Sequence, residues 1–254
     1  MLAIDCGNSR LKWACFDAGR KGATSSFPVG ADSFEFERAV QTLDKPIDRV
    51  LVSNVAGVAV AGRIGDAVAE RFGIEAEFVA VTGNAHGIEC GYREPGTLGV
   101  DRWLAMIAAR RLAGGPLVVV GVGTAVTIDV VDADGRHLGG LILPGDGLMI
   151  DALASNTAGI EQVARAGTAR EGLALLGRST AESVGHGGRL ALAASVDRIT
   201  DLASAAFGTE PALWLTGGDA ELLTGWLASD ASVRADLVLE GLAAVAESTE
   251  DGSA

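Results

Sequence analysis

The chain has 254 residues, with 20 Lys and Arg against 33 Asp and Glu, which gives a formal charge of −13 at pH 7. Hydrophobic residues make up 48%, a share too high for an intrinsically disordered chain. The acidic balance argues against a general nucleic-acid-binding protein, whose phosphate contacts need a face of Lys and Arg. The length suffices for one large domain or two small ones.

Cysteine usage and the N-terminus indicate the compartment. Cys6, Cys15 and Cys90 are an odd number without metal-ligand spacing, which favours a reducing compartment and no disulfide framework. The chain begins without the basic and apolar regions of a signal peptide. Its longest apolar stretch, residues 117–128, is too short to span a bilayer. We therefore expect a cytoplasmic protein without a membrane partner, and the scattered histidines predict no metal site.

The first half of the chain reads as alternating strands and helices. A strand at residues 2–4 leads through a turn at 6–9 into a second strand, which ends at an Asp/Gly turn. Apolar periodicity and helix end signals predict the remaining elements. The second strand covers residues 10–16, and the remaining elements are strands at 49–53 and 78–82 and helices at 56–72 and 101–112.

The second half opens like the first. A strand at 117–120 meets a Gly-containing turn, and a second strand at 126–131 ends at another Asp/Gly turn. A shift of 116 places Gly7 on Gly123 and Gly19 on Gly135 without gaps. A period this long favours duplicated domains over a solenoid. We expect domains at 1–115 and 116–254, the second with a helix at 146–154, a strand at 212–215 and a mostly helical remainder.

The two Gly-containing turns predict a phosphate clamp. Glycine lets a backbone approach a ligand closely, and its amides can point at an anion. Asn8, Ser9 and Thr124 add polar donors, and Arg10 and Lys12 add positive charge. Turn geometry alone explains a single Gly turn, but a pair in register favours two hairpins facing each other across a cleft. Neither turn leads into a helix, which excludes the Walker and dinucleotide-binding patterns.

Two carboxylates flank these features. Asp5 ends the first strand, where it could orient a hydrated Mg²⁺ or cap the turn. Asp101 begins a helix and by itself would be a first-turn acidic residue. Next to a phosphate cleft it could instead accept the proton of an attacking hydroxyl. Arg102 could hold an anionic substrate group, and Tyr92, the only tyrosine, lies close by in the sequence.

At this point the sequence resembles a known family. Residues 5–12 (DCGNSRLK), Tyr92 with residues 98–102 (LGVDR), and residues 123–129 (GTAVTID) resemble, in order, three motifs of type III pantothenate kinases. Five shorter segments also fall in family order, at 139–140, 144–145, 156–158, 179–180 and 216–219. The resemblance runs from residue 1 to about residue 245.

The resemblance implies an actin-like fold, with two related α/β domains of the ribonuclease H-like type and an ATP cleft between them. It also implies a homodimer that transfers the γ-phosphate of ATP, with Mg²⁺, to pantothenate in the first step of coenzyme A biosynthesis. By position, ATP would contact Asp5, Cys6, Gly7, Asn8, Ser9, Arg10, Leu11, Lys12, Gly123 and Thr124. Pantothenate would contact Tyr92, Gly99, Val100, Asp101, Arg102 and Thr180, with Asp101 as proton acceptor.

One position departs from the family pattern. The family usually has an Asp where this chain has Gly121, and that Asp binds the activating monovalent cation, K⁺ or NH₄⁺. Gly121 is also the counterpart of Asp5 in the internal repeat. Three hypotheses follow: the protein works without the cation, holds it by backbone carbonyls, or has lost kinase activity.

Two other functions compete with the kinase. One is a non-catalytic regulatory relative of the transcriptional accessory factor type, against which the retained motif residues argue. The other is a different actin-like phosphotransferase or phosphatase. Tyr92 and the segment 99–102 favour pantothenate over this second alternative, such as a sugar kinase or a polyphosphate hydrolase.

Overall fold

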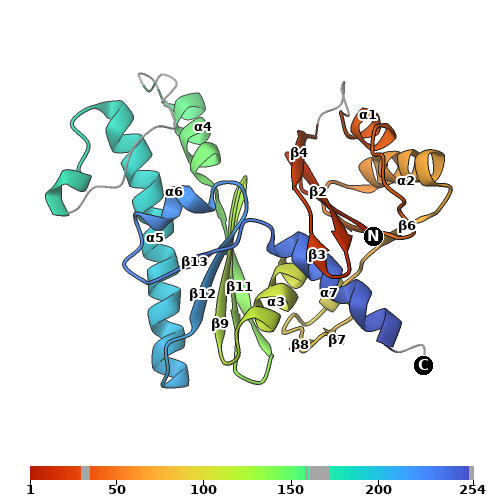
Figure 1. The fold of residues 1–254 in the computed structure, drawn as a ribbon. Coiled ribbons are helices and arrows are strands. Elements are labelled where there is room, and N and C mark those ends of the chain that lie inside the picture. Colours follow the sequence, from red (N-terminus) through yellow and green to blue (C-terminus); the bar gives the residue numbers. More distant parts are fainter. Residues whose placement is uncertain (30–34, 158–159, 161–171, 252–254) are drawn as a thin grey trace. The chain divides into compact units, whose positions relative to one another are not determined.

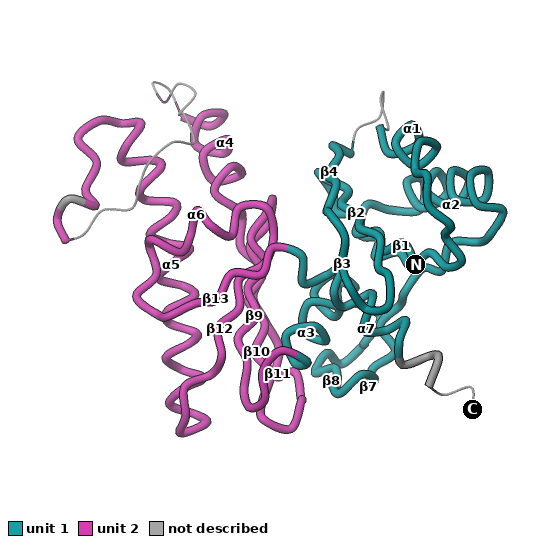
Figure 2. The backbone as a smooth tube through the Cα atoms, in the orientation of Figure 1, with its two compact units in different colours: residues 1–111, 236–254 teal, residues 112–235 magenta. Residues whose placement is uncertain are grey.

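The computed structural model describes residues 1–29, 35–157, 160 and 172–251. The chain forms two compact units, residues 1–111 with 236–254, and residues 112–235 (Figure 2). Each unit combines a mixed sheet with helices (Figure 1), so the α/β class expected from the sequence is confirmed. Among the described residues, no helix is long and apolar enough to cross a membrane.

Unit 1 is built on a six-stranded sheet in the order β3-β2-β1-β5-β6, with β4 also paired to β2. β1 runs antiparallel to β2 and parallel to β5, which is itself parallel to β6. The strands are β1 Leu2–Cys6, β2 Arg10–Asp17, β3 Arg20–Lys21, β4 Ser25–Pro28, β5 Val50–Asn54 and β6 Ala76–Phe78. A separate ribbon pairs β7 Asn84–Ala85 with β8 Ile88–Glu89.

Side chains alternate across the central strand β1. Leu2 and Ile4 pack with apolar residues of α1 and α2, whereas Ala3 packs with α3 and α7. Because successive residues of a strand point to opposite faces, Asp5 lies on the face of Ala3. The helical segments of this unit are α1 Glu35–Gln41, α2 Val58–Phe72, η1 Pro95–Thr97, α3 Val100–Leu112 and α7 Leu237–Asp251.

The chain returns to unit 1 through α7. The sequence analysis placed residues 236–254 in the second half, but Leu239 and Leu242 of α7 join the buried cluster that contains Ala3. Gly241 allows this close packing, because a Cβ atom there would lie 2.2 Å from the carbonyl oxygen of Leu104 in α3. Burial of the apolar face of α7 is therefore what assigns it to unit 1.

Unit 2 repeats the strand arrangement of unit 1 in the order β11-β10-β9-β12-β13. In both sheets, antiparallel pairing on one side of the central strand gives way to parallel pairing on the other. The strands are β9 Leu117–Val122, β10 Ala125–Val131, β11 His137–Pro144, β12 Ala212–Thr216 and β13 Ser232–Val233. The helical segments are α4 Asp146–Asn156, η2 Gly172–Leu175, α5 Thr180–Phe207 and α6 Ala220–Thr224.

The two hairpins differ in length, so the gapless alignment is wrong beyond the first turn. Asp5 pairs with Lys12 in unit 1, whereas its counterpart Gly121 pairs with Thr127 in unit 2. The second hairpin is therefore one residue shorter. Gly7 and Gly123 still correspond, since each donates its amide to the carbonyl at the start of the following strand.

Most elements expected from the sequence are confirmed with shifted ends, but the strand at 78–82 is wrong. The strand is β6 Ala76–Phe78, and after it only the amide of Val79 still donates to the sheet, to Val52. Val79 and Val81 instead pack against the cluster around Ala3. Residue 158 of the motif at 156–158, and most of 158–171 in the expected helical remainder, lie outside the described residues.

Candidate active site

The β1–β2 turn carries the first group of candidate residues. Gly7 donates its amide to the carbonyl of Arg10 at 3.0 Å, which closes a tight hairpin with Asn8 and Ser9 exposed at its tip. The carbonyl of Ser9 accepts the amide of Val29 at 3.0 Å. The turn is thus fixed at its base, while polar groups remain exposed at its tip.

Asp5 stands at the centre of a charged cluster below this turn. The strand register places it between Lys12 on β2 and Ser53 on β5. Burial and the nearby charge of Asp101 raise the pKa of Asp5 to about 7, against the lowering influence of Ser53 and Lys12. Oδ1 of Asp5 is buried and accepts no hydrogen bond from the described residues. An acceptor left in this state is suited to a donor supplied by a ligand or its water shell.

Asp101 lies in the first turn of α3. Just before this helix, the carbonyl of Gly99 accepts the amide of Trp103 at 3.1 Å. The Asp101 carboxylate accepts the amide of Arg102 at 2.9 Å. Gly99 leaves the space for it, because a Cβ atom at that position would lie 2.5 Å from Oδ1 of Asp101. The influence of Asp101 on the pKa of Asp5 brings it into the same electrostatic cluster.

Tyr92 and Arg102 form a pair. The buried Arg102 donates from Nη1 to the hydroxyl of Tyr92 at 2.8 Å, and its guanidinium lies 5.5 Å from the centroid of the tyrosine ring. A guanidinium held both by a hydrogen bond and by a ring face has a defined orientation. These two residues thus lie together in unit 1, and their role in binding substrate stays a prediction.

Cys6 is buried next to this cluster. Burial, with the neighbouring charge of Asp5, raises the pKa of its thiol to about 12. A thiol in this state is not a nucleophile at neutral pH.

The second hairpin and Thr180 belong to unit 2. Gly123 donates its amide to the carbonyl of Ala125 at 3.1 Å, and Thr124 is exposed at the turn. Gly145, which precedes α4, donates its amide to the carbonyl of Thr124 at 2.9 Å, so the start of α4 supports this turn. Thr180 is the exposed first residue of α5.

A side chain at position 121 would press on its neighbour on β10. A Cβ atom on Gly121 would lie 2.7 Å from Oγ1 of Thr127 on the neighbouring strand. An aspartate there would require Thr127 to move. Where the family resemblance led us to expect an aspartate, the structure thus has a glycine beside a threonine hydroxyl.

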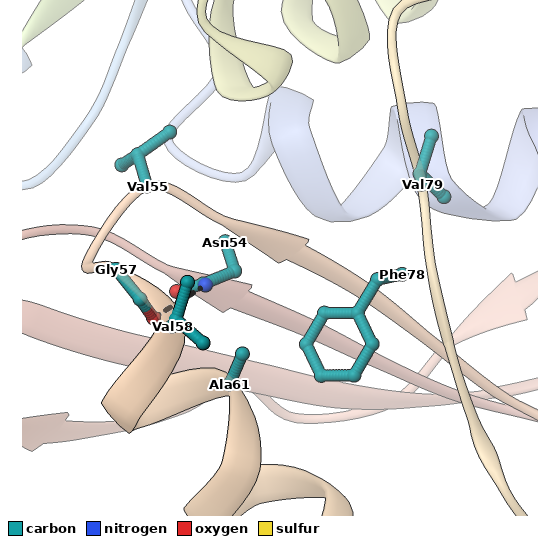
Figure 3. A pocket seen from close by; sticks show the side chains of 7 residues that line it. All are labelled: Asn54, Val55, Gly57, Val58, Ala61, Phe78 and Val79. Carbon is teal, nitrogen blue, oxygen red and sulfur yellow. Dashed lines mark hydrogen bonds between the residues drawn. The ribbon is translucent and has the colours of Figure 1, made fainter.

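A cavity of about 470 Å³ opens at the carboxyl ends of β5 and β6 (Figure 3). Ligands of α/β sheets commonly bind at this edge. Val55 and Val79, two of its lining residues, also pack in the cluster that contains Val100, the residue before Asp101. The full lining is Asn54, Val55, Gly57, Val58, Ala61, Phe78 and Val79.

Sequence reasoning missed two members of the charged cluster. Ser53 reaches Asp5 through the parallel register of β1 and β5. Asp236 reaches Lys12 and Lys21 from the start of α7. The only sequence signal for Asp236 was an acidic residue before an apolar periodic run, which is typical of a helix start.

Comparison with known proteins identifies the family. A family model described as type III pantothenate kinase matches residues 1–202. The chain belongs to the type III pantothenate kinase family. A type III pantothenate kinase of Verminephrobacter eiseniae is 40% identical over 253 residues, spanning 95% of this chain and 93% of that protein. Another, from Nitrosococcus oceani, is 36% identical over 257 residues, spanning 98% and 94%.

Solved structures agree on the fold. A Baf family transcriptional activator from Campylobacter jejuni aligns with a TM-score of 0.61 at 18% identity, covering 99% of this chain and 100% of that one. Together with other structural neighbours, this likeness confirms the actin-like fold expected from the sequence. Membership of the type III pantothenate kinase family makes the chain an enzyme of the kinase class.

Proposed function

We propose that this chain transfers the γ-phosphate of ATP to the primary hydroxyl of pantothenate and forms 4′-phosphopantothenate, the first step of coenzyme A biosynthesis. Family membership supports the reaction. The observation that carries the mechanism is the charged cluster of unit 1, in which Asp101 acts electrostatically on Asp5 directly below the β1–β2 turn.

ATP contacts are assigned to both Gly-containing hairpins. The exposed groups of residues 7–10 and the side chain of Lys12 would bind phosphate oxygens, and Gly123 and Thr124 would contribute further donors. Asp5 fits a hydrated Mg²⁺, since its buried Oδ1 accepts no hydrogen bond from the described residues and would accept one from a metal-bound water. The ion would neutralise negative charge on the phosphates.

Asp101 would act as the general base. It would orient the pantothenate hydroxyl and accept its proton as the oxygen attacks the γ-phosphorus in line, with ADP as the leaving group. Arg102, fixed by Tyr92, would hold a polar or anionic group of pantothenate, and Thr180 is proposed as a further contact. The cavity at β5 and β6 is apolar enough to receive the dimethyl portion of the molecule.

No step of this mechanism passes through a monovalent cation. Gly121 offers no carboxylate, and the hydroxyl of Thr127 occupies the adjoining space. We propose that the enzyme works without K⁺ or NH₄⁺ activation. The alternative is a cation site formed by backbone carbonyls. Turnover that rises when potassium is added would reveal such a site.

We also propose a homodimer. β11 is an edge strand of unit 2 and exposes three aliphatic side chains, Leu138 at 53%, Leu141 at 45% and Ile142 at 65%. An exposed apolar edge strand favours pairing with another chain. A second copy of this chain is the occupant that the family resemblance implies.

The decisive test is ADP release by purified protein with ATP, Mg²⁺ and pantothenate, with omission of pantothenate as the control. Pantothenate-dependent ADP release with formation of 4′-phosphopantothenate is expected. Folded protein without turnover would favour the non-catalytic regulatory relative, whereas ADP release independent of pantothenate would favour another phosphotransferase or a phosphatase.

A further inference from the structure

Asp236 lies at the junction where the chain re-enters unit 1. It directly precedes α7, and its carbonyl accepts the amide of Glu240 at 3.0 Å, as expected at a helix start. Its carboxylate contacts the strands that follow the β1–β2 turn. Oδ2 accepts hydrogen bonds from Lys21 and, at 2.7 Å, from Thr24.

The other oxygen of this carboxylate is directed to Lys12. Oδ1 of Asp236 lies 3.6 Å from Nζ of Lys12, an ion pair longer than a hydrogen bond. Both side chains are largely shielded, with 15% of Asp236 and 19% of Lys12 exposed. Bulk solvent therefore screens this pair less than it screens a surface pair.

Lys12 thus interacts electrostatically with two acidic side chains. Asp5 is its cross-strand partner, and Asp236 reaches it from α7. Partial burial acts to raise the pKa of Asp236, but the hydrogen bonds from Lys21 and Thr24 and the charges of Lys21 and Lys12 lower it overall. Asp236 is consequently a fixed negative charge at neutral pH.

A lysine side chain is long and loses considerable rotamer freedom when it is held in place. Two anchors on Oδ2 fix the carboxylate, and the fixed carboxylate confines the ammonium group of Lys12 below the turn. The ion pair sets the position of the ammonium without defining the direction of its N–H bonds. This arrangement suits a lysine that must meet phosphate oxygens without first being ordered.

We infer that Asp236 is a positioning residue of the nucleotide site. Asp236 holds the ammonium of Lys12 beside Asp5, so that Lys12 is already in position when the phosphates of ATP bind. Asp236 itself touches no reacting atom in this scheme. The inference rests on the proposed function, in which Lys12 contacts ATP.

The test is a double-mutant cycle with Asp236→Asn, Lys12→Met and the double variant in the full chain. Asp236→Asn should raise KM for ATP about tenfold, with KM for pantothenate unchanged, because it releases Lys12. In the Lys12→Met background the same substitution should have no further effect. Equal effects in both backgrounds, or an equal rise in both KM values, would overturn the inference.

Three further measurements separate positioning from stability and from the proposed function. Lys21→Met is the matched structural control, because Thr24 still holds the carboxylate, and its effect on KM for ATP should be clearly smaller. Asp236→Glu keeps the charge, so its KM for ATP should lie closer to the wild-type value than that of Asp236→Asn, and it takes the place of Asp236→Asn should that variant fail to fold. Calorimetric binding of a non-hydrolysable ATP analogue with Mg²⁺ reports on Lys12 even if pantothenate turnover is absent.

Discussion

Gly99 leaves the space that the carboxylate of Asp101 fills, since a Cβ atom at position 99 would lie 2.5 Å from Asp101 Oδ1. We expect Gly99→Ala to displace this carboxylate and to lower kcat roughly 10- to 100-fold, because small misplacements of a catalytic group are costly. Gly96→Ala is the control, as a Cβ atom there meets nothing within 4 Å. Steady-state kinetics on both variants make the test, and equal effects would remove the special role of Gly99.

Asp101→Asn should lower kcat by roughly 10²-fold or more, the range of a lost general base. The fold should persist, because the asparagine oxygen can still accept the amide of Arg102. Glu35→Gln, a first-turn acidic residue of α1, serves as the control for a simple helix-dipole role. Near-normal turnover of Asp101→Asn would reassign Asp101 to stabilising the start of α3.

Asp5→Asn should lower the activity and raise the stability of the ligand-free protein. In the folded protein the pKa of Asp5 is raised to about 7, whereas in the unfolded chain the carboxyl group loses its proton near its ordinary pKa of 3.8. This group therefore lowers the stability of the ligand-free protein as the pH rises through that window. Asparagine does not titrate, so Asp5→Asn should raise the free energy of unfolding near pH 8 by on the order of 1–3 kcal/mol.

Urea unfolding of both proteins at about pH 4 and pH 8 measures this difference. The gain should shrink at the lower pH, where both states of wild-type Asp5 approach protonation. A gain that is independent of pH would assign it to packing instead. Turnover of the variant should fall, since Asp5 is proposed to hold the water shell of Mg²⁺.

Potassium should leave turnover unchanged. Initial rates with K⁺, NH₄⁺ or Na⁺ as the only monovalent cation should be indistinguishable, because Gly121 supplies no carboxylate. The double variant Gly121→Asp, Thr127→Ala adds a carboxylate together with the space it needs. A clear potassium response of the wild-type protein would contradict cation independence and indicate other ligands.

Ile142→Asp should weaken the proposed homodimer, because it places a charge on an edge strand where this side chain is 65% exposed. Sedimentation velocity over a range of concentrations measures the change. Leu202→Asp, which alters an aliphatic residue of α5 that is 46% exposed, controls for a general effect of surface charge. A monomeric wild-type protein, or dimers of equal stability in all three, would reject this interface.

Local pattern was sufficient for elements whose signals lie within one stretch of chain. The helix at 101–112 appears as α3 Val100–Leu112, and the strand at 212–215 as β12 Ala212–Thr216. The short strands β3 and β13 carry too few residues for a periodic signal. The strand expected at 78–82 failed because Val79 and Val81 are apolar for packing rather than for sheet pairing.

The site was accessible from sequence only where its residues are neighbours in the chain. The turn residues and Asp101 stand in compact motifs, whereas Ser53 joins Asp5 through a parallel register that no local pattern encodes. Asp236 is more distant still, since its contact with Lys12 depends on the return of α7 to unit 1. The sequence also did not show that the second hairpin is one residue shorter than the first. In the structure Gly121 corresponds to Asp5, but Thr127, and not residue 128, corresponds to Lys12.

The return of α7 gives the protein an order of assembly. During synthesis, residues 112–235 leave the ribosome as one continuous segment before α7 exists, so unit 2 can collapse while one face of the β1 sheet still lacks the part of its cover that α7 provides. Asp236 arrives together with that cover. The proposed nucleotide site would therefore be completed only when the core beneath it closes, and we expect a nascent chain to bind ATP poorly until then.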